Sequence, residues 1–193
     1  MKFFPKIKIS MPTIIFVGLL IVLDRSFLSL LALSAALIHE LGHLTVMLLL
    51  GVKVSEVEIT FFGAEIRTKK PTYSVLGNIA IFGAGAAANI LSAVIIYSLP
   101  SPPFKAVFFA GASLSLAVIN LLPIRTLDGG CIIEAIILSV LPQYAPIILD
   151  IISSLTLGLL WLTAIYLLLI NSGNLSLMLF CMYLFVTLAF GSQ

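Results

Sequence analysis

Charged residues are scarce in this sequence: they make up 9% of its 193 residues, ten basic and eight acidic. A typical soluble domain has about 25% charged residues. The charged side chains of this chain are therefore too few to cover the surface of a soluble fold. The scarcity also excludes a disordered chain and a nucleic-acid-binding protein, which needs a basic stripe. The two cysteines lie in apolar stretches and form no disulfide framework. Hydrophobic residues make up 61% of the chain, which predicts an all-α polytopic membrane protein.

Apolar stretches predict about six transmembrane helices, since a span needs about 20 residues. The first is short and follows three lysines, as in a signal peptide, but no small-residue cleavage site follows Leu23, so we expect an uncleaved span. We expect one transmembrane domain over residues 1–193, with a core at about 27–131 and accessory helices at about 145–190. The stretches cover residues 9–23, 27–50, 73–99, 106–122, 145–170 and 175–190.

A more polar segment follows the second stretch. Apolar residues from Val57 onward alternate with Glu58 and Thr60, and the alternation resumes after Gly63. A period of two on both sides of a glycine predicts a β-hairpin, at about residues 52–70. The segment is too polar to cross the hydrocarbon core, so we expect it to lie at the membrane surface or to dip into it.

The basic residues predict the orientation of the chain. Cytoplasmic loops carry an excess of Lys and Arg. If the N-terminus is cytoplasmic and all six stretches cross, only Arg25 and Lys105 lie outside. Eight basic residues then lie inside: Lys2, Lys6, Lys8, Lys53, Arg67, Lys69, Lys70 and Arg125.

The two histidines of the chain lie in one window, His39-Glu40-Leu41-Gly42-His43. Residues four apart share a helix face, so both imidazoles can reach one metal ion, and Glu40 can act as a general base on water. A pair of core histidines is the alternative. Ionisable groups inside a transmembrane helix are costly and by default mark function. The motif therefore predicts a metal site.

A catalytic zinc site needs a third protein ligand. Asp128 is a candidate because it follows a proline-containing break and precedes two glycines. Non-helical backbone at membrane depth is tolerated only inside protein or beside a wet cavity. The alternative is a loop carboxylate that caps the next helix. Glu134 and Cys131 are further alternatives for the ligand; Glu134 otherwise is a polar helix residue, and Cys131 a small core residue.

The sequence resembles the site-2 protease family of intramembrane zinc metalloproteases. The resemblance rests on HELGH in an apolar helix and on Asn120-x-x-Pro-x-x-x-x-Asp-Gly downstream, and it covers about Phe27 to Cys131. It implies that His39, His43 and Asp128 bind one zinc ion. It further implies that Glu40 is the general base and that Asn120 positions or polarises the substrate. A transmembrane or membrane-associated protein is then the substrate, and no nucleic acid is expected.

The third stretch fits the family less closely. Members often have a Gly-Pro step followed by Asn, where this chain has a run of small residues from Gly83 to Asn89 without proline. Asn89 is a candidate for the family's substrate-binding role, and close helix packing is the alternative. No PDZ or CBS module is expected, so the chain is most similar to the minimal branch that processes a sporulation sigma factor. That similarity implies a bacterial cell membrane.

The hairpin is a candidate for holding the substrate. A helical substrate hides its peptide bonds, so cleavage needs an extended segment. An edge strand that includes Ile59 and Phe61 would pair with such a segment by strand addition; the alternative is an inert surface loop. Two other functions remain open: a non-catalytic membrane protein that holds a partner, and a metal transporter. A transporter needs polar groups along a path, and the last two stretches offer few besides Asp150, which we expect to be solvated or locally paired.

Overall fold

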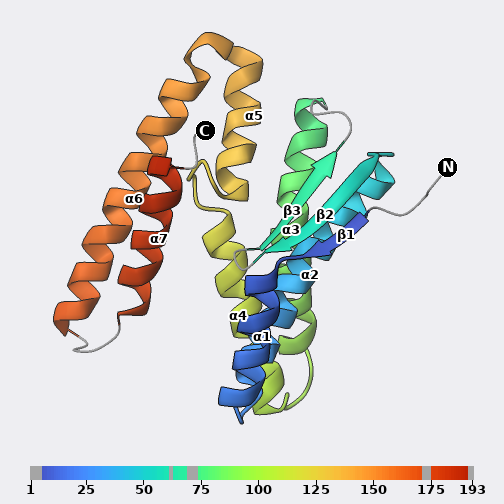
Figure 1. Ribbon diagram of the computed structural model, residues 1–193. Helices are drawn as coiled ribbons and strands as arrows, with labels where there is room; N and C mark the ends of the chain where they lie inside the picture. The colour runs from blue at the N-terminus through green and yellow to red at the C-terminus, as the bar shows by residue number, and fades with distance from the viewer. Residues whose placement is uncertain (1–5, 61–62, 69–73, 171–174, 191–193) are drawn as a thin grey trace. The chain divides into compact units, whose positions relative to one another are not determined.

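The computed structural model describes residues 6–60, 63–68, 74–170 and 175–190 (Figure 1). The chain divides into two compact units, Met1–Ile119 and Asn120–Gln193, and each is described by itself. The expected single domain over residues 1–193 stays a prediction.

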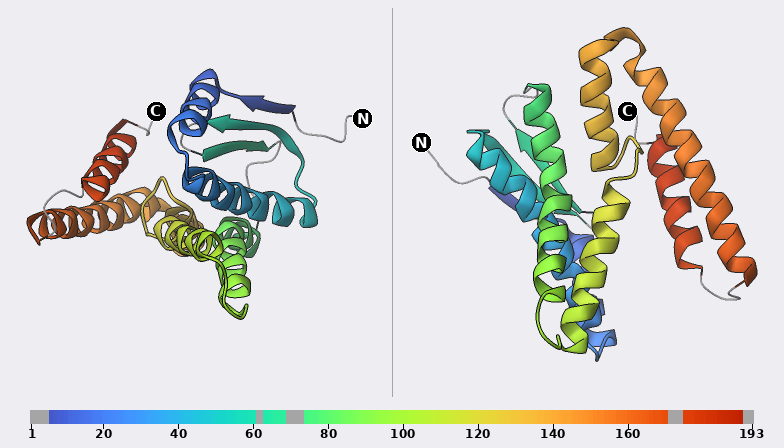
Figure 2. Two further views of the ribbon diagram at one scale, coloured as in Figure 1. Left: turned by 90° about the horizontal axis from the view of Figure 1, so that it is seen from below. Right: turned by 180° about the vertical axis from the view of Figure 1, so that it is seen from behind.

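The described residues of the first unit form four helices. They are α1 (Met11–Leu23), α2 (Leu28–Leu49), α3 (Val75–Tyr97) and α4 (Phe104–Asn120), which ends one residue into the second unit. Helices α2 and α3 run side by side in both views (Figures 1 and 2). Gly42 permits this close approach, because a Cβ atom there would lie 2.6 Å from the carbonyl oxygen of Ala84.

Three short strands complete the first unit: β1 (Lys6–Ile9), β2 (Val54–Thr60) and β3 (Gly63–Thr68). Strands β2 and β3 pair antiparallel, which confirms the predicted hairpin after α2. Strand β1 pairs parallel with the other edge of β2, so the sheet order is β1-β2-β3. Strand β1 is not predicted by the sequence, in which its lysines indicate only charges that flank a span.

The sheet packs against the C-terminal half of α2. Met47 of α2, Val52 and Ile81 of α3 form a buried apolar cluster, and side chains from both strands of the hairpin cover it. The covering residues are Val46, Val54 and Ile66. Burial of these apolar groups fixes the hairpin to the two helices that carry the small residues and the histidines.

The second unit contains α5 (Asp128–Val140), a short 3-10 turn (Pro142–Tyr144), α6 (Ala145–Ile170) and α7 (Ser176–Phe190). Helices α6 and α7 lie side by side in Figures 1 and 2. Their buried cluster consists of Ile124, Leu157, Ala164, Cys181 and Leu184. Ile124 belongs to the loop before α5, so this loop is anchored in the core of the second unit.

The helices agree with the predicted fold class, a helical membrane protein with a β-hairpin after the second helix. Three segments of the described chain are long and apolar enough to cross a membrane: α2, α3 and Pro142–Ile170. The helices over Met11–Leu23, Phe104–Asn120 and Ser176–Ala189 are apolar but shorter than the about 20 residues of a full span. Crossing by all six stretches therefore stays a prediction.

Candidate metal centre

The two histidines of the HELGH motif face each other on α2. Both side chains are buried, and their Nε2 atoms lie 3.1 Å apart. A tetrahedral cation with metal–nitrogen distances of about 2.0–2.1 Å holds two imidazole nitrogens about 3.3 Å apart. The spacing of His39 and His43 therefore fits a single metal ion, as the i, i+4 spacing predicted.

The orientation of the His43 ring is set by α3. Nδ1 of His43 lies 2.7 Å from the backbone carbonyl oxygen of Ile81. A carbonyl oxygen only accepts hydrogen bonds, so Nδ1 carries the proton and donates it. Nε2 of the neutral ring then presents its lone pair, which is the form that binds metals. Ile81 could not be identified from the sequence. Every residue has a backbone carbonyl, and the residue type does not show which carbonyl accepts a hydrogen bond.

Asn89 of α3 lies against the other histidine. Its side chain is fully buried, and its Nδ2 atom lies 3.4 Å from Nδ1 of His39. Helix packing alone therefore does not account for Asn89, because its amide contacts a histidine of the motif. The predicted contact with substrate is a separate matter: this arrangement puts Asn89 behind the His39 ring, and substrate binding by Asn89 stays a prediction.

Gly85 lets the two imidazole rings approach the backbone of α3. A Cβ atom at this position would lie 2.4 Å from Nε2 of His43 and 2.6 Å from Nε2 of His39. Both distances are too short for a methyl group, so a larger residue here would displace the rings. The run of small residues in the third stretch had indicated only close helix packing.

Asp128 is the first residue of α5 and is partly buried. Leu127, not Asp128, occupies the N-cap position that the capping alternative required. The two glycines that follow are needed for packing, since a Cβ at Gly129 or Gly130 would collide with the backbone of the loop before α5. Asp128 belongs to the second unit, and its role as third ligand stays a prediction.

The remaining candidate residues lie on α2, α4 and α5. Glu40 follows His39 on α2 and is partly buried. Asn120 is the last residue of α4 and is also partly buried. Cys131 and Glu134, the alternative ligands, lie three and six residues beyond Asp128 on the partly buried side of α5.

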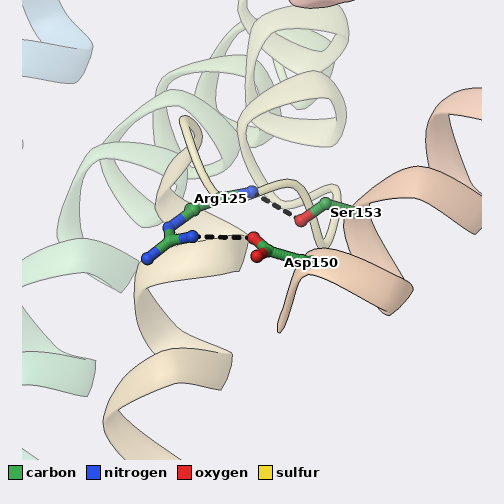
Figure 3. Close-up of polar contacts among 3 residues, drawn as sticks. All are labelled: Arg125, Asp150 and Ser153. Atoms are coloured by element: carbon green, nitrogen blue, oxygen red, sulfur yellow. Dashed lines mark hydrogen bonds and ion pairs between the residues drawn. The ribbon is translucent and has the colours of Figure 1, made fainter. Parts of the chain in front are cut away.

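The loop that leads to Asp128 is held by α6 (Figure 3). The backbone N–H of Arg125 donates a 3.0 Å hydrogen bond to the hydroxyl of Ser153, which is fully buried. The Arg125 guanidinium forms an ion pair of 2.7 Å with Asp150. Asp150 is thus locally paired, as the sequence analysis expected.

The structure corrects the predicted edge strand. Ile59 lies in the central strand β2, where it pairs with Ile9 of β1 and with Ala64 of β3. Both backbone edges of β2 are occupied, so Ile59 cannot pair with a substrate strand. Within the described residues, β3 pairs only with β2, and it supplies the free edge of the hairpin. Phe61 lies outside the described residues.

Comparison with known proteins supports the same fold. No protein-family model matches the chain. The structure is similar to that of the Site-2 Protease from Methanocaldococcus jannaschii, with a TM-score of 0.62 and 22% sequence identity over 97% of this chain and 90% of that one. The likeness to this structure agrees with the family resemblance of the two motifs, and at this identity it establishes the fold.

A curated relative is similar in sequence. The protein named "Putative zinc metalloprotease sll0528", from Synechocystis sp., is 30% identical over 116 residues, which are 56% of this chain. The match spans 31% of the relative's own length, about a third. What the rest of that protein does is therefore no guide to this chain.

Proposed function

We propose that this chain is an intramembrane zinc metalloprotease of the site-2 type, which hydrolyses peptide bonds within or near transmembrane segments of membrane-associated proteins. The carrying observation is the pair of buried Nε2 atoms, 3.1 Å apart on a helix long and apolar enough to cross a membrane. Burial of two imidazoles in such a helix is costly and is compensated when they bind a cation.

His39, His43 and Asp128 would hold the zinc ion. Two histidines and one carboxylate form a common ligand set of catalytic zinc sites and leave the fourth position for water or substrate. For the neutral ring of His43, the Ile81 carbonyl selects the tautomer in which Nδ1 carries the proton and Nε2 presents its lone pair. Asp128 is the acidic residue in the first turn of α5, and the loop before it is braced by α6.

Zinc, when bound, would polarise a water molecule and the scissile carbonyl group. Glu40 takes a proton from the attacking water, whose oxygen bonds to the carbonyl carbon. Glu40 then delivers this proton to the leaving nitrogen as the C–N bond breaks, so no covalent enzyme intermediate is needed. Asn120 donates its amide N–H to the carbonyl oxygen on which negative charge develops.

The free edge of β3 would hold the substrate in an extended form. An exposed edge has unpaired N–H and C=O groups that can pair with an added strand. Ile81 links this edge to the site: it belongs to the buried cluster against which Val54 and Ile66 of the hairpin pack, and its carbonyl accepts a hydrogen bond from His43. A substrate strand on β3 would thus lie on the same packed cluster that orients a metal ligand.

The orientation follows from the basic residues. We place the N-terminus and the active-site side at the cytoplasmic face of a bacterial cell membrane, because Lys and Arg concentrate in the segments that then lie inside.

Zinc content of detergent-purified protein is the first test. We expect about one zinc ion per chain in the wild type and loss of zinc in His43→Ala and Asp128→Asn. Asp24→Asn is the matched control, because it changes the same group in an exposed turn and should keep zinc. Zinc retained in Asp128→Asn would contradict the ligand set, and Glu134 would then be the next candidate.

Glu40→Gln separates a protease from a non-catalytic protein that only holds a membrane partner. The variant should keep zinc and lose about 10²–10⁴-fold of the rate, the range of general acid–base catalysis. It should also retain uncut substrate, which crosslinking and mass spectrometry would identify. A partner that is bound equally by wild type and variant, and cut by neither, would favour the binding protein.

A further inference from the structure

Helix α3 presents three groups to the histidines at four-residue intervals: the Ile81 carbonyl, the Gly85 backbone and the Asn89 amide. Residues spaced by four lie on one face of a helix. The Ile81 carbonyl accepts a hydrogen bond from His43, and Gly85 lets both imidazole rings approach the helix backbone. The interaction of Asn89 with His39 remains to be explained.

The Asn89 amide is unevenly satisfied. Its Oδ1 atom is buried and has no hydrogen-bond partner among the described residues, while its Nδ2 atom lies 3.4 Å from Nδ1 of His39. An unpaired polar atom in a buried position is costly. A half-turn of the terminal side-chain torsion exchanges oxygen and nitrogen, because that torsion is broad and roughly two-fold.

The observed contacts fit one arrangement of protons. Asn89 Nδ2–H donates to Nδ1 of His39, Nε2–H of His39 donates to Nε2 of His43, and Nδ1–H of His43 donates to the Ile81 carbonyl. In this chain of hydrogen bonds, Nε2 of His39 carries a proton. A nitrogen that carries a proton has no lone pair to bind a metal ion.

A second arrangement fits the same ring positions. The Asn89 amide is turned, so that Oδ1 accepts a hydrogen bond from Nδ1–H of His39 and Nδ2 takes the position that Oδ1 held. Nε2 of His39 then presents its lone pair beside that of His43. The ring is neutral in both arrangements: one proton leaves Nε2 and one arrives at Nδ1, exchanged through water.

We propose that Asn89 is a positioning residue whose amide turns when His39 binds metal, donating to Nδ1 in one arrangement and accepting from Nδ1–H in the other. The proposal rests on the zinc site proposed above. Metal-bound histidines generally donate their second nitrogen to an acceptor, and Ile81 supplies that acceptor for His43. Asn89 supplies it for His39. An asparagine can satisfy both arrangements, whereas an aspartate satisfies only the metal-binding one and a leucine neither.

Nitrogen-15 NMR of the histidine rings tests the proposal directly. The chain has two histidines, so labelling with ¹⁵N-histidine gives four ring signals. In detergent-purified wild type from which zinc has been removed with a chelator, addition of Zn²⁺ should move the proton of His39 from Nε2 to Nδ1, while His43 keeps its proton on Nδ1. In Asn89→Asp, the His39 proton should be on Nδ1 with or without zinc.

Zinc affinity, measured by competition with a chromogenic chelator, gives a second readout. Asn89→Leu should bind zinc about 10–100-fold more weakly, the usual effect of losing such an outer partner. Asn89→Asp should bind at least as tightly as the wild type. Asn78→Leu is the matched control, since Asn78 lies in the first turn of the same helix and should leave the affinity unchanged.

The following outcomes would each overturn the proposal, the one for Asn89→Asp being decisive when Asn89→Leu does not fold. The first is wild-type affinity in Asn89→Leu. The second is a His39 proton on the same nitrogen before and after zinc addition, which leaves the proposed protease function intact. If Asn89→Leu fails to fold, the spectrum of Asn89→Asp decides, and an Nε2 proton on His39 in that variant contradicts the proposal. The third is a wild type that binds no zinc, which overturns the proposed function as well.

Discussion

The backbone N–H of Arg125 donates a hydrogen bond of 3.0 Å to the hydroxyl of Ser153, twenty-eight residues further along the chain. Ser153 is fully buried in α6, and the side chain of the neighbouring Ile124 is fully buried in the same unit. The loop before Asp128 is therefore fixed to α6 by a partly buried hydrogen bond and by apolar packing. The Arg125–Asp150 ion pair adds less, because it is partly exposed and such pairs contribute about 0–1 kcal/mol.

Ser153→Ala should weaken this loop. The Arg125 amide loses its acceptor, which costs about 1–3 kcal/mol for a buried donor. We expect a lower melting temperature in detergent and a weaker affinity for zinc, because Arg125 lies three residues before Asp128. Ser154→Ala is the control, since Ser154 is exposed on the same helix. Equal melting temperatures and affinities in the two variants would contradict a bracing role for Ser153.

Gly85→Ala should remove metal binding. The added methyl carbon would collide with both Nε2 atoms, at 2.4 and 2.6 Å, and would displace the imidazole rings. We expect zinc affinity to fall by more than the about 10–100-fold typical of lost outer partners. Gly83→Ala makes the same change two residues earlier on α3, where no heavy atom lies within 4 Å, and should bind zinc as the wild type does. Tight zinc binding by Gly85→Ala would show that the cation sits elsewhere.

Proline substitutions in β3 test the substrate edge. Successive N–H groups of an antiparallel strand point alternately toward the partner strand and away from it. Proline at one of the neighbours Glu65 and Ile66 should therefore break the pairing with β2 and lower stability. Proline at the other should keep stability and zinc but abolish cleavage. If the stable variant cleaves at the wild-type rate, substrate does not pair with β3.

The hydrogen bonds to Asp24, in the turn between α1 and α2, predict that the stability of the protein depends on pH. The Ser26 hydroxyl, and then the Ser29 hydroxyl and N–H, donate to its carboxylate and hold the pKa of Asp24 well below its usual range. A depressed folded-state pKa gives stability that is present above the unfolded pKa of about 3.9 and is lost as pH falls toward the folded value. The melting temperature of wild type should therefore exceed that of Asp24→Asn at pH 7, and the gap should narrow at pH 3. A gap that does not change with pH would contradict this assignment.

Six of the described helices could be predicted from the sequence, because each depends on the length of one apolar run, whereas α5 was expected only as a helix after Asp128, without bounds. The stretch expected at 145–170 is α6 over Ala145–Ile170, and the other ends agree within about two residues. The hairpin was predictable too, since its alternation and its glycine are local signals. Strand β1 was not, because four residues carry little pattern and their parallel pairing with β2 joins segments about fifty residues apart.

The candidate site, like the fold, could be predicted from the sequence only in part. The sequence by itself determined that His39 and His43 share a face of one apolar helix, since helical periodicity fixes the direction of residues four apart. Only the tertiary structure decided what stands behind them: the Ile81 carbonyl at His43, the Asn89 amide at His39, and β2 as the central strand. These contacts come from packing between segments distant in the chain, whose partners and side-chain orientations no local pattern specifies.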